Sequence, residues 1–192
     1  PVVIHGGWEF RLEGAYFAKV WDPRKMVTAT PPKGSYEELL GIDFGDQPGK
    51  QVVLYLMVDE RGGAKGYPHI HVDDEYVGET GRETNEDDAR ATLAMLRRHR
   101  SKWADLKGAA ADRAHKGGRA DQKSAVDLAR AIAAELGLEL RALDPPITVA
   151  KRGEGRGGGS VMNRWRWLHG QMARGNLTVH PRCKHLIEAL PK

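Results

Sequence analysis

The chain has one cysteine, Cys183, among its 192 residues. A single thiol cannot form an internal disulfide, and it excludes a zinc site built mainly from cysteines. The sequence also lacks any apolar run of the roughly 20 residues that a membrane span needs. Residues 1–7 have neither the basic nor the apolar part of a secretory signal. Because the chain does not begin with methionine, we expect it to be a fragment.

The residues that are present have the proportions of an ordinary folded domain. Hydrophobic residues make up 40% of the chain and charged residues 29%, and both values are close to globular averages. A length of 192 residues suits one domain with a sizeable core, which excludes a multidomain motor within this chain. Residues 1–35 combine aromatic residues with prolines and are expected to form a packed lead-in to one domain over residues 36–192.

The positive charge is concentrated near the end of the sequence. The chain carries a net charge of +4, and residues 151–192 hold nine Lys or Arg residues against Glu154 and Glu188. This stretch therefore carries +7, and residues 1–150 carry −3. A basic face attracts phosphate backbones by releasing counterions. A solvated helix face would have the same composition, so charge alone leaves both interpretations open.

Short apolar runs between turn residues predict the strands. We expect strands at residues 36–43, 51–58, 68–72, 108–111, 147–150 and 177–179. The run Gly-Ala-Ala-Ala at 108–111 has helical propensity, but it lies between two predicted helices, where a short buried strand is typical.

Apolar residues at helical spacing predict three helices. One begins after Thr84 or Asn85 with acids in its first turn, the second covers 121–136, and the third covers 160–174. Three antiparallel strands followed by alternating helices and strands predict an α/β fold with a mixed sheet.

Two aspartates lie at the ends of predicted strands. Asp43 ends the first strand, and Asp112 follows the alanine run. Asp43 alone would fit turn chemistry. If the first and fourth strands are adjacent, however, the two carboxylates converge, and such a pair suits Mg²⁺ or Mn²⁺. Two such ions can activate water and stabilise the leaving oxygen of a phosphodiester.

Other polar residues near the third strand are weaker candidates. Glu75 is a second-rank metal ligand, although Asp73, Asp74 and Glu75 together are expected to be a solvated strand end. His69 and His71 share one strand face and could bind metal, but without a third ligand we expect them to be exposed histidines.

A cluster of His180, Cys183 and His185 is interpreted as fortuitous.

The basic residues of the last stretch are candidates for DNA contacts. The glycine-rich loop at 151–159 is suited to phosphate contact without sequence preference, although a linker has the same composition. Trp165 lies on the apolar stripe of the third helix and is expected in the core, whereas Trp167 points elsewhere and could pack or stack on a base. The candidate DNA-binding residues are Lys151, Arg152, Arg156, Arg164 and Arg166.

Several short motifs, taken in their order along the chain, resemble those of a known protein family. They are GWEF at 7–10, EGAYF at 13–17, GIDFG at 41–45, DEY at 74–76, ADRA at 111–114, NRW at 163–165 and GNLTVHPRCKHLIE at 175–188. In this order and spacing the chain resembles the large subunit of tailed-phage terminases. The resemblance covers the end of the linker from the ATPase domain and most of the C-terminal nuclease domain.

The resemblance implies an RNase H-like fold and a metal-dependent endonuclease that cuts concatemeric double-stranded viral DNA during packaging. Asp43 would bridge two Mg²⁺ or Mn²⁺ ions and Asp112 would hold one. A third acid on a later helix has no match before Lys192, so the domain at 36–192 is expected to be truncated and this chain alone to bind metal weakly or not at all.

The same resemblance implies further parts of the assembly. Residues 1–35 would lead in from an ATPase domain, which agrees with the lack of a GxxxxGK[ST] phosphate loop here. Further partners would be the portal and the small terminase subunit, in the cytoplasm of a bacterial host and without a membrane.

The residues leave two alternative functions open. One is a DNA- or partner-binding module on a degenerate nuclease fold. The other is a fragment of an actin-like phosphotransferase, for whose duplicated domain and adenosine motif the chain has no room.

Overall fold

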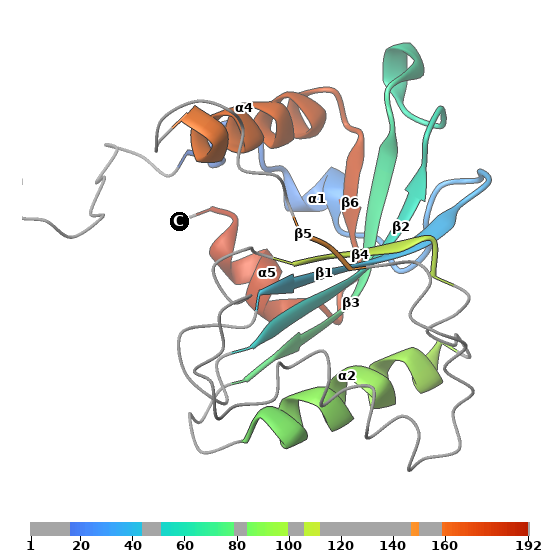
Figure 1. Ribbon diagram of the computed structural model, residues 1–192. Helices are drawn as coiled ribbons and strands as arrows, with labels where there is room; N and C mark the ends of the chain where they lie inside the picture. The colour runs from blue at the N-terminus through green and yellow to red at the C-terminus, as the bar shows by residue number, and fades with distance from the viewer. Residues whose placement is uncertain are drawn as a thin grey trace, which may run out of the picture.

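The computed structural model describes residues 16–43, 51–78, 84–99, 106–111, 147–149 and 159–191. Within these ranges a six-stranded sheet has the order β5-β4-β1-β2-β3-β6, with helices on both of its faces (Figure 1). The helix predicted at 121–136 lies outside the described residues. Among the helices of the described ranges, none has the length and apolar character to cross a membrane.

The first three strands form an antiparallel meander, as predicted. They are β1 (Glu37–Asp43), β2 (Val52–Asp59) and β3 (His69–Val77). The pairing of β2 with β3 shifts register between Tyr55 and Leu56, which leaves Asp73 as an extra residue in β3. This β-bulge allows β3 to continue beyond residue 72, where the sequence predicted its end.

Three short parallel strands complete the mixed sheet. They are β4 (Gly108–Ala111), β5 (Ile147–Val149) and β6 (Leu177–Val179). β4 pairs with β1, β5 with β4, and β6 with β3. The alanine run is therefore a strand, and the predicted mixed α/β sheet is confirmed.

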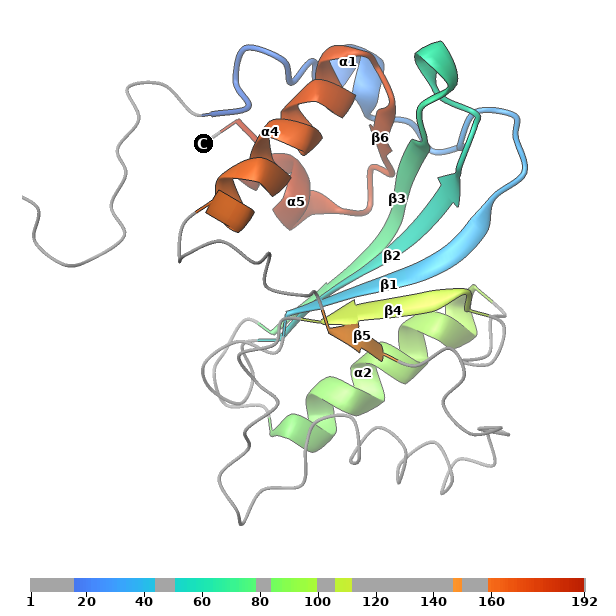
Figure 2. The ribbon, with the colours of Figure 1, turned by 45° about the horizontal axis from the view of Figure 1, so that its top comes forward.

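One face of the sheet is covered by α2 (Asn85–Arg98) (Figure 2). The Thr84 side chain accepts a hydrogen bond from the backbone N–H of Asp87, whose carboxylate accepts the Thr84 N–H in return. This capping box fixes the start of the helix. Ala89, Leu93 and Leu96 recur at helical spacing and are buried, as the sequence predicted.

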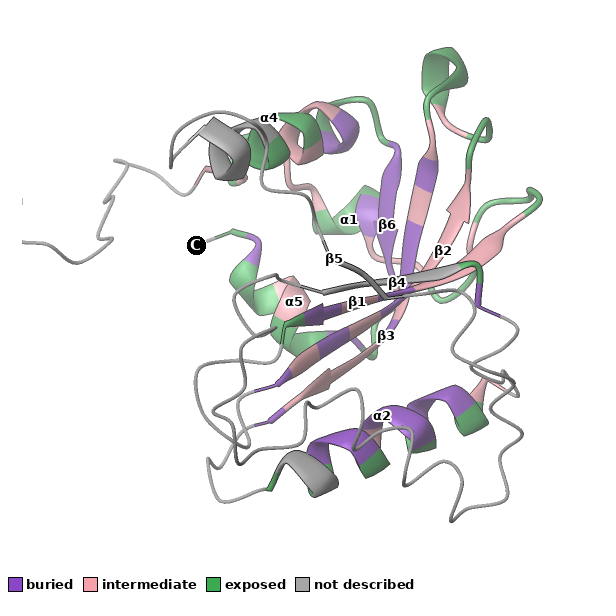
Figure 3. Ribbon diagram, in the orientation of Figure 1, coloured by how far each residue is buried: buried purple, intermediate pink, exposed green. Residues whose placement is uncertain are grey.

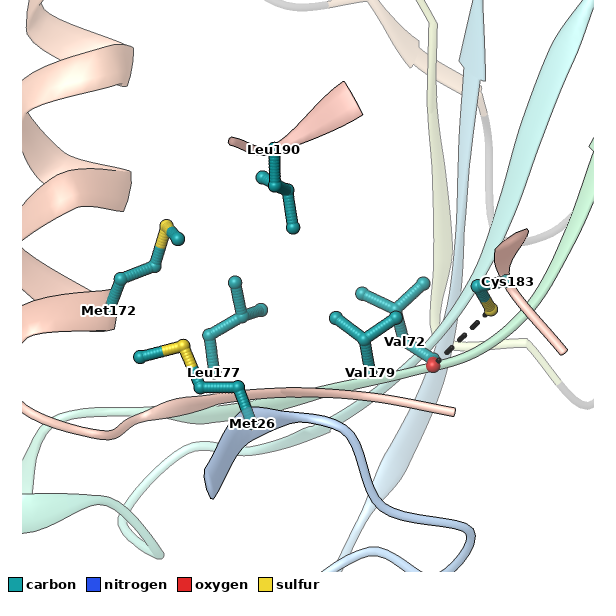
Figure 4. Close-up of a cluster of buried hydrophobic side chains, with 7 residues drawn as sticks. All are labelled: Met26, Val72, Met172, Leu177, Val179, Cys183 and Leu190. Carbon is teal, nitrogen blue, oxygen red and sulfur yellow. Dashed lines mark hydrogen bonds between the residues drawn. The ribbon is translucent and has the colours of Figure 1, made fainter. Parts of the chain in front are cut away.

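The opposite face carries α1 (Pro23–Met26), α4 (Gly159–Ala173) and α5 (Lys184–Ala189), which surround an apolar cluster (Figure 4). The Cys183 thiol lies in this cluster, 3.6 Å from the carbonyl oxygen of Val72. Burial raises the pKa of this thiol to about 12. The cluster consists of Met26, Val72, Met172, Leu177, Val179, Cys183 and Leu190.

The lead-in packs directly on the domain. Met26 is part of the apolar cluster, and the backbone N–H of Thr28 donates to the carbonyl of Val179 at 3.0 Å. Val27 also forms a parallel bridge to Val179. The part of the lead-in that the structure describes therefore continues the edge of the sheet beside β6.

Three expectations about burial are wrong. His69 and His71 are 5% and 0% exposed rather than solvated, and Asp74 is 4% exposed in the middle of β3 rather than at a solvated strand end. Trp165 is 43% exposed rather than in the core. The apolar stripe of α4 reaches the core at Met172, which belongs to the apolar cluster, and at Leu168, which packs against it, whereas the helix is exposed around Trp165 (Figure 3).

Candidate metal centre

Asp43 is the last residue of β1 and is exposed. The parallel pairing of β1 with β4 places Leu40 opposite Ala109 and Ile42 opposite Ala111. Asp43 follows Ile42 in the sequence, just as Asp112 follows Ala111. Asp112 itself lies outside the described residues, so its place beside Asp43 stays a prediction.

The side chain of Asp43 belongs to the sheet face that α2 does not cover. On the covered face, Tyr55 stacks on His99 at the end of α2, with ring centroids 4.2 Å apart. Leu40 pairs with Tyr55 across β1 and β2 and shares that face. Because side chains alternate along a strand, Asp43 lies on the other face, together with Glu75 of β3.

Glu75 is occupied by the first turn of α5. Its Oε1 accepts the backbone N–H of His185 at 2.7 Å, and its Oε2 accepts that of Leu186 at 3.0 Å. The Nδ1 atom of His185 lies 3.1 Å from Oε1. The carboxylate thus caps the positive end of α5. That Glu75 also binds metal stays a prediction.

Within the described ranges, no group of three His, Cys, Asp or Glu side chains is arranged to hold a metal ion. His180 and Cys183, two members of the cluster interpreted as fortuitous, have other partners. The backbone N–H and Nε of Arg182 are 3.1 and 3.0 Å from Nδ1 of His180, and the buried Cys183 faces the Val72 carbonyl.

A charged network on the α2 face was not predicted. His99 follows the last turn of α2, and its Nδ1 lies 3.1 Å from Asp73 while its Nε2 lies 2.9 Å from Asp74. Arg98 also donates to Asp74, at 2.8 Å. Because both imidazole nitrogens face carboxylates, His99 must carry both protons to donate to each.

The electrostatics of this network follow from the same contacts. Hydrogen bonds to Asp73 and Asp74 raise the pKa of His99 to about 9, although partial burial opposes the rise. Hydrogen bonds from His71 and His99 hold the pKa of Asp73 far below its usual value. Burial alone would raise the pKa of Asp74, but hydrogen bonds from His99 and Arg98 outweigh it and lower that pKa.

The two buried histidines of β3 share one hydroxyl of β6. Nε2 of His69 and Nδ1 of His71 lie 3.1 and 2.9 Å from Oγ1 of Thr178. Nε2 of His71 lies 3.4 Å from Asp73, which connects this pair to the His99 network. Burial, the largest cause, lowers the pKa of His69, and nearby His71 lowers it further. These histidines tie β6 and β3 together, and the alternation of histidines in β3 was the signal for a shared face.

Of the basic candidates, two lie in the part of the chain that the structure describes and three lie outside it. Arg164 and Arg166 lie on α4 and are exposed. Lys151, Arg152 and Arg156 lie outside the described residues. Both arginines belong to the helix on the sheet face opposite α2 (Figure 2), which is the face to which strand alternation assigns Asp43.

No family of known proteins and no curated protein is matched by the sequence. The structure is similar to the large terminase of a thermophilic bacteriophage, with a TM-score of 0.57 and 12% identity over 93% of this chain and 37% of that chain. The same terminase solved with ADP gives a TM-score of 0.56 with the same identity and coverage. The large terminase nuclease of thermophilic phage G20c, solved with bound cobalt, is more distant: its TM-score is 0.45 and its identity 13%, over 93% of this chain and 79% of that chain.

The chain spans 37% of the length of the first of these terminases. At 12% identity this likeness concerns the fold. Together with the strand order and the parallel pairing of β1 with β4, it confirms the fold class expected from the sequence. The chain has an RNase H-like α/β fold, shared with the matched part of a phage large terminase.

Proposed function

We propose that this chain is the DNA-cutting domain of a terminase that packages viral genomes. The observation that carries the proposal is the parallel pair of β1 and β4, which ends with Ile42 opposite Ala111. Each of these residues is followed by an aspartate in the sequence. Paired carboxylates at one sheet edge are the donor set that Mg²⁺ and Mn²⁺ prefer.

In this proposal Asp43 and Asp112 would hold the metal ions, and the exposure of Asp43 would let a phosphate of the DNA backbone reach an ion held there. The bound ions would lower the pKa of a water and stabilise the leaving oxygen. Glu75 holds α5 on the same sheet face through its bonds to His185 and Leu186. A basic stretch of +7 over residues 151–192 would contribute phosphate contacts.

The proposal extends to the longer protein. The structurally similar large terminase has been solved with ADP and with ATP-gamma-S, and this chain covers 37% of its length. We therefore propose that the whole protein also carries an ATPase domain and works with double-stranded DNA, a portal and a small subunit in a bacterial host.

Plasmid nicking by the complete protein tests the proposal. Replacing Asp43 by Asn should lower the Mn²⁺-dependent nicking of supercoiled plasmid by at least about 100-fold, as expected when a charge-stabilising group is lost from an active site. Glu60→Gln is the matched control, because Glu60 is an exposed acid on the β2–β3 connection. Unchanged nicking by the Asp43 variant would remove Asp43 from the site.

A non-catalytic DNA- or partner-binding module is the second candidate. It is favoured by the contacts of Glu75, whose two carboxylate oxygens already accept the N–H groups of His185 and Leu186. Salt-dependent DNA binding by the complete protein, without any metal-dependent cleavage, would support this candidate against the first.

A further inference from the structure

One turn of α4 has no buried residue. Arg164, Trp165, Arg166 and Trp167 are four consecutive exposed residues, and at 3.6 residues per turn four residues cover every side of a helix. We call these four residues the α4 turn. Figure 3 shows this part of α4 as exposed, whereas the end of the helix is buried.

The two tryptophans make this exposure unusual. Trp165 is 43% and Trp167 is 50% exposed, and with Tyr67 they are the large hydrophobic side chains of the described residues that are most open to solvent. Exposed aromatic groups on a soluble domain often mark a binding surface. A helix that only needed solubility would carry polar side chains at these positions.

The ring of Trp165 is held in place on one side. Its centroid lies 5.6 Å from that of Tyr16 and 6.0 Å from that of Phe17. Tyr16 also packs against His169, one turn further along α4, at 5.4 Å. These contacts fix the orientation of the indole, so its exposed part is a preorganised flat surface.

The charge of the helix identifies the class of partner. α4 contains no acidic residue, and the exposed turn has two arginines between and beside the tryptophans. A partner must therefore offer negative charge together with flat apolar faces. A nucleic-acid strand offers both, since its phosphates pair with arginine and its bases stack on aromatic rings.

We propose that the α4 turn binds an unpaired DNA strand, with the indoles stacked on bases and the arginines on phosphates. Base faces inside a duplex are covered by neighbouring pairs, so stacking requires bases that have left the duplex, as at a frayed end or a displaced strand. α4 lies on the sheet face opposite α2 (Figure 2), which is the face to which strand alternation assigns Asp43. The inference rests on DNA as the substrate of the proposed function, but not on its cleavage chemistry.

Binding measured in EDTA tests the surface without cleavage. The probe is a fluorescently labelled strand of about 20 nucleotides, which exceeds the site of one nucleic-acid-binding domain. The strand is used alone and also annealed to its complement as a blunt duplex, and binding is followed by the fluorescence anisotropy of the label. Trp167→Ala should weaken binding of the single strand by roughly 5- to 100-fold, the range expected for one lost stacking contact. Trp167→Phe should retain most of the affinity, and circular dichroism checks that both variants fold.

The contribution of the two arginines is tested through the salt dependence of single-strand binding. The double variant Arg164→Gln/Arg166→Gln should reduce the slope of log affinity against log salt by about 1.4, since each phosphate contact on a single strand contributes about 0.7. The control Arg61→Gln/Lys65→Gln removes the same charge from exposed positions on the β2–β3 connection. This control should leave the slope unchanged.

Three results would overturn the inference. The first is that Trp167→Ala binds the single strand as tightly as the wild type. The second is that Trp167→Ala weakens the binding of single strand and duplex equally. The third is that Trp167→Ala weakens binding to anionic vesicles but has no effect on DNA binding. The proposed function is tested separately by Asp43→Asn, which should keep single-strand binding while losing nicking. If Asp43→Asn loses nicking and the α4 variants bind normally, the proposed function stands and this inference fails.

Discussion

Ile42 of β1 lies directly opposite Ala111 of β4 in a parallel pair. Strands β1 and β4 are separated in the sequence by β2, β3 and α2, so the pairing is a property of the fold. It brings together two strands whose next residues are Asp43 and Asp112. Parallel strands direct their carboxyl ends to one sheet edge, so we propose that Asp43 and Asp112 reach one metal ion.

The first prediction concerns metal binding by residues 1–192 alone. Calorimetric titration with Mn²⁺ should give a dissociation constant of about 1 mM or weaker, because two carboxylates are a small donor set for a hard cation. Asp112→Asn should weaken the binding further, whereas Glu60→Gln should not. Tight binding of two ions to this chain would contradict the prediction, and would show that the chain already holds a complete ligand set.

The positions of Asp43 and α2 were predictable because their signals are local. Alternating apolar residues indicate β1 and β2, and Thr84 with the following acids indicates the start of α2. The adjacency of β1 and β4 was only a condition of the argument from the sequence, and the structure shows this pairing. The candidate site stays a prediction, which rests on two acids that each follow a strand.

The remaining features depend on contacts between distant residues. The bulge at Asp73 turns two consecutive acids toward His99, and no local pattern signals a bulge. His69 and His71 are buried beside Thr178, more than 100 positions away in the sequence. α5 was missed because Cys183 makes no side-chain capping bond, while the cap comes from Glu75 in a distant strand.

A second prediction concerns the two roles considered for Glu75. Glu75→Ala removes the acceptor of the His185 and Leu186 N–H groups, and an unsatisfied donor costs about 1–3 kcal/mol. Amide hydrogen exchange at these two positions should accelerate in this variant. Glu75→Gln keeps one acceptor oxygen and should lose less protection. If Glu75→Gln instead lowers Mn²⁺ affinity of the complete protein without changing the exchange, Glu75 acts as a ligand.

A third prediction concerns the buried methionine of α4. Met172 is 1% exposed within the apolar cluster, so Met172→Ala should lower the free energy of unfolding by about 2–5 kcal/mol. Urea denaturation measures this loss. Lys25→Ala, at an exposed position whose side chain is 83% exposed, should change stability by no more than about 0.5 kcal/mol. A similar small effect for Met172 would mean that α4 does not pack on this cluster.

A fourth prediction concerns the pH dependence that His99 confers. Its pKa is raised to about 9 by Asp73 and Asp74, above the unfolded value of about 6.5. The stabilisation is therefore complete below about pH 6.5 and is lost as the pH rises through about 9, with a total of up to about 3 kcal/mol. On the acid side, the lowered pKa values of Asp73 and Asp74 predict a second loss below about pH 4.

Urea denaturation of wild type and His99→Gln from pH 5 to 10 checks this dependence. Glutamine keeps a polar side chain but cannot carry the charge, so the variant should be less stable at pH 6 and should approach the wild type near pH 10. Asp73→Asn should make the loss of stability with rising pH smaller, because it removes the largest cause of the raised His99 pKa. Parallel stability curves for wild type and His99→Gln would mean that His99 is not charged between the two aspartates, and that the stacking of Tyr55 on His99 holds the end of α2 by packing alone.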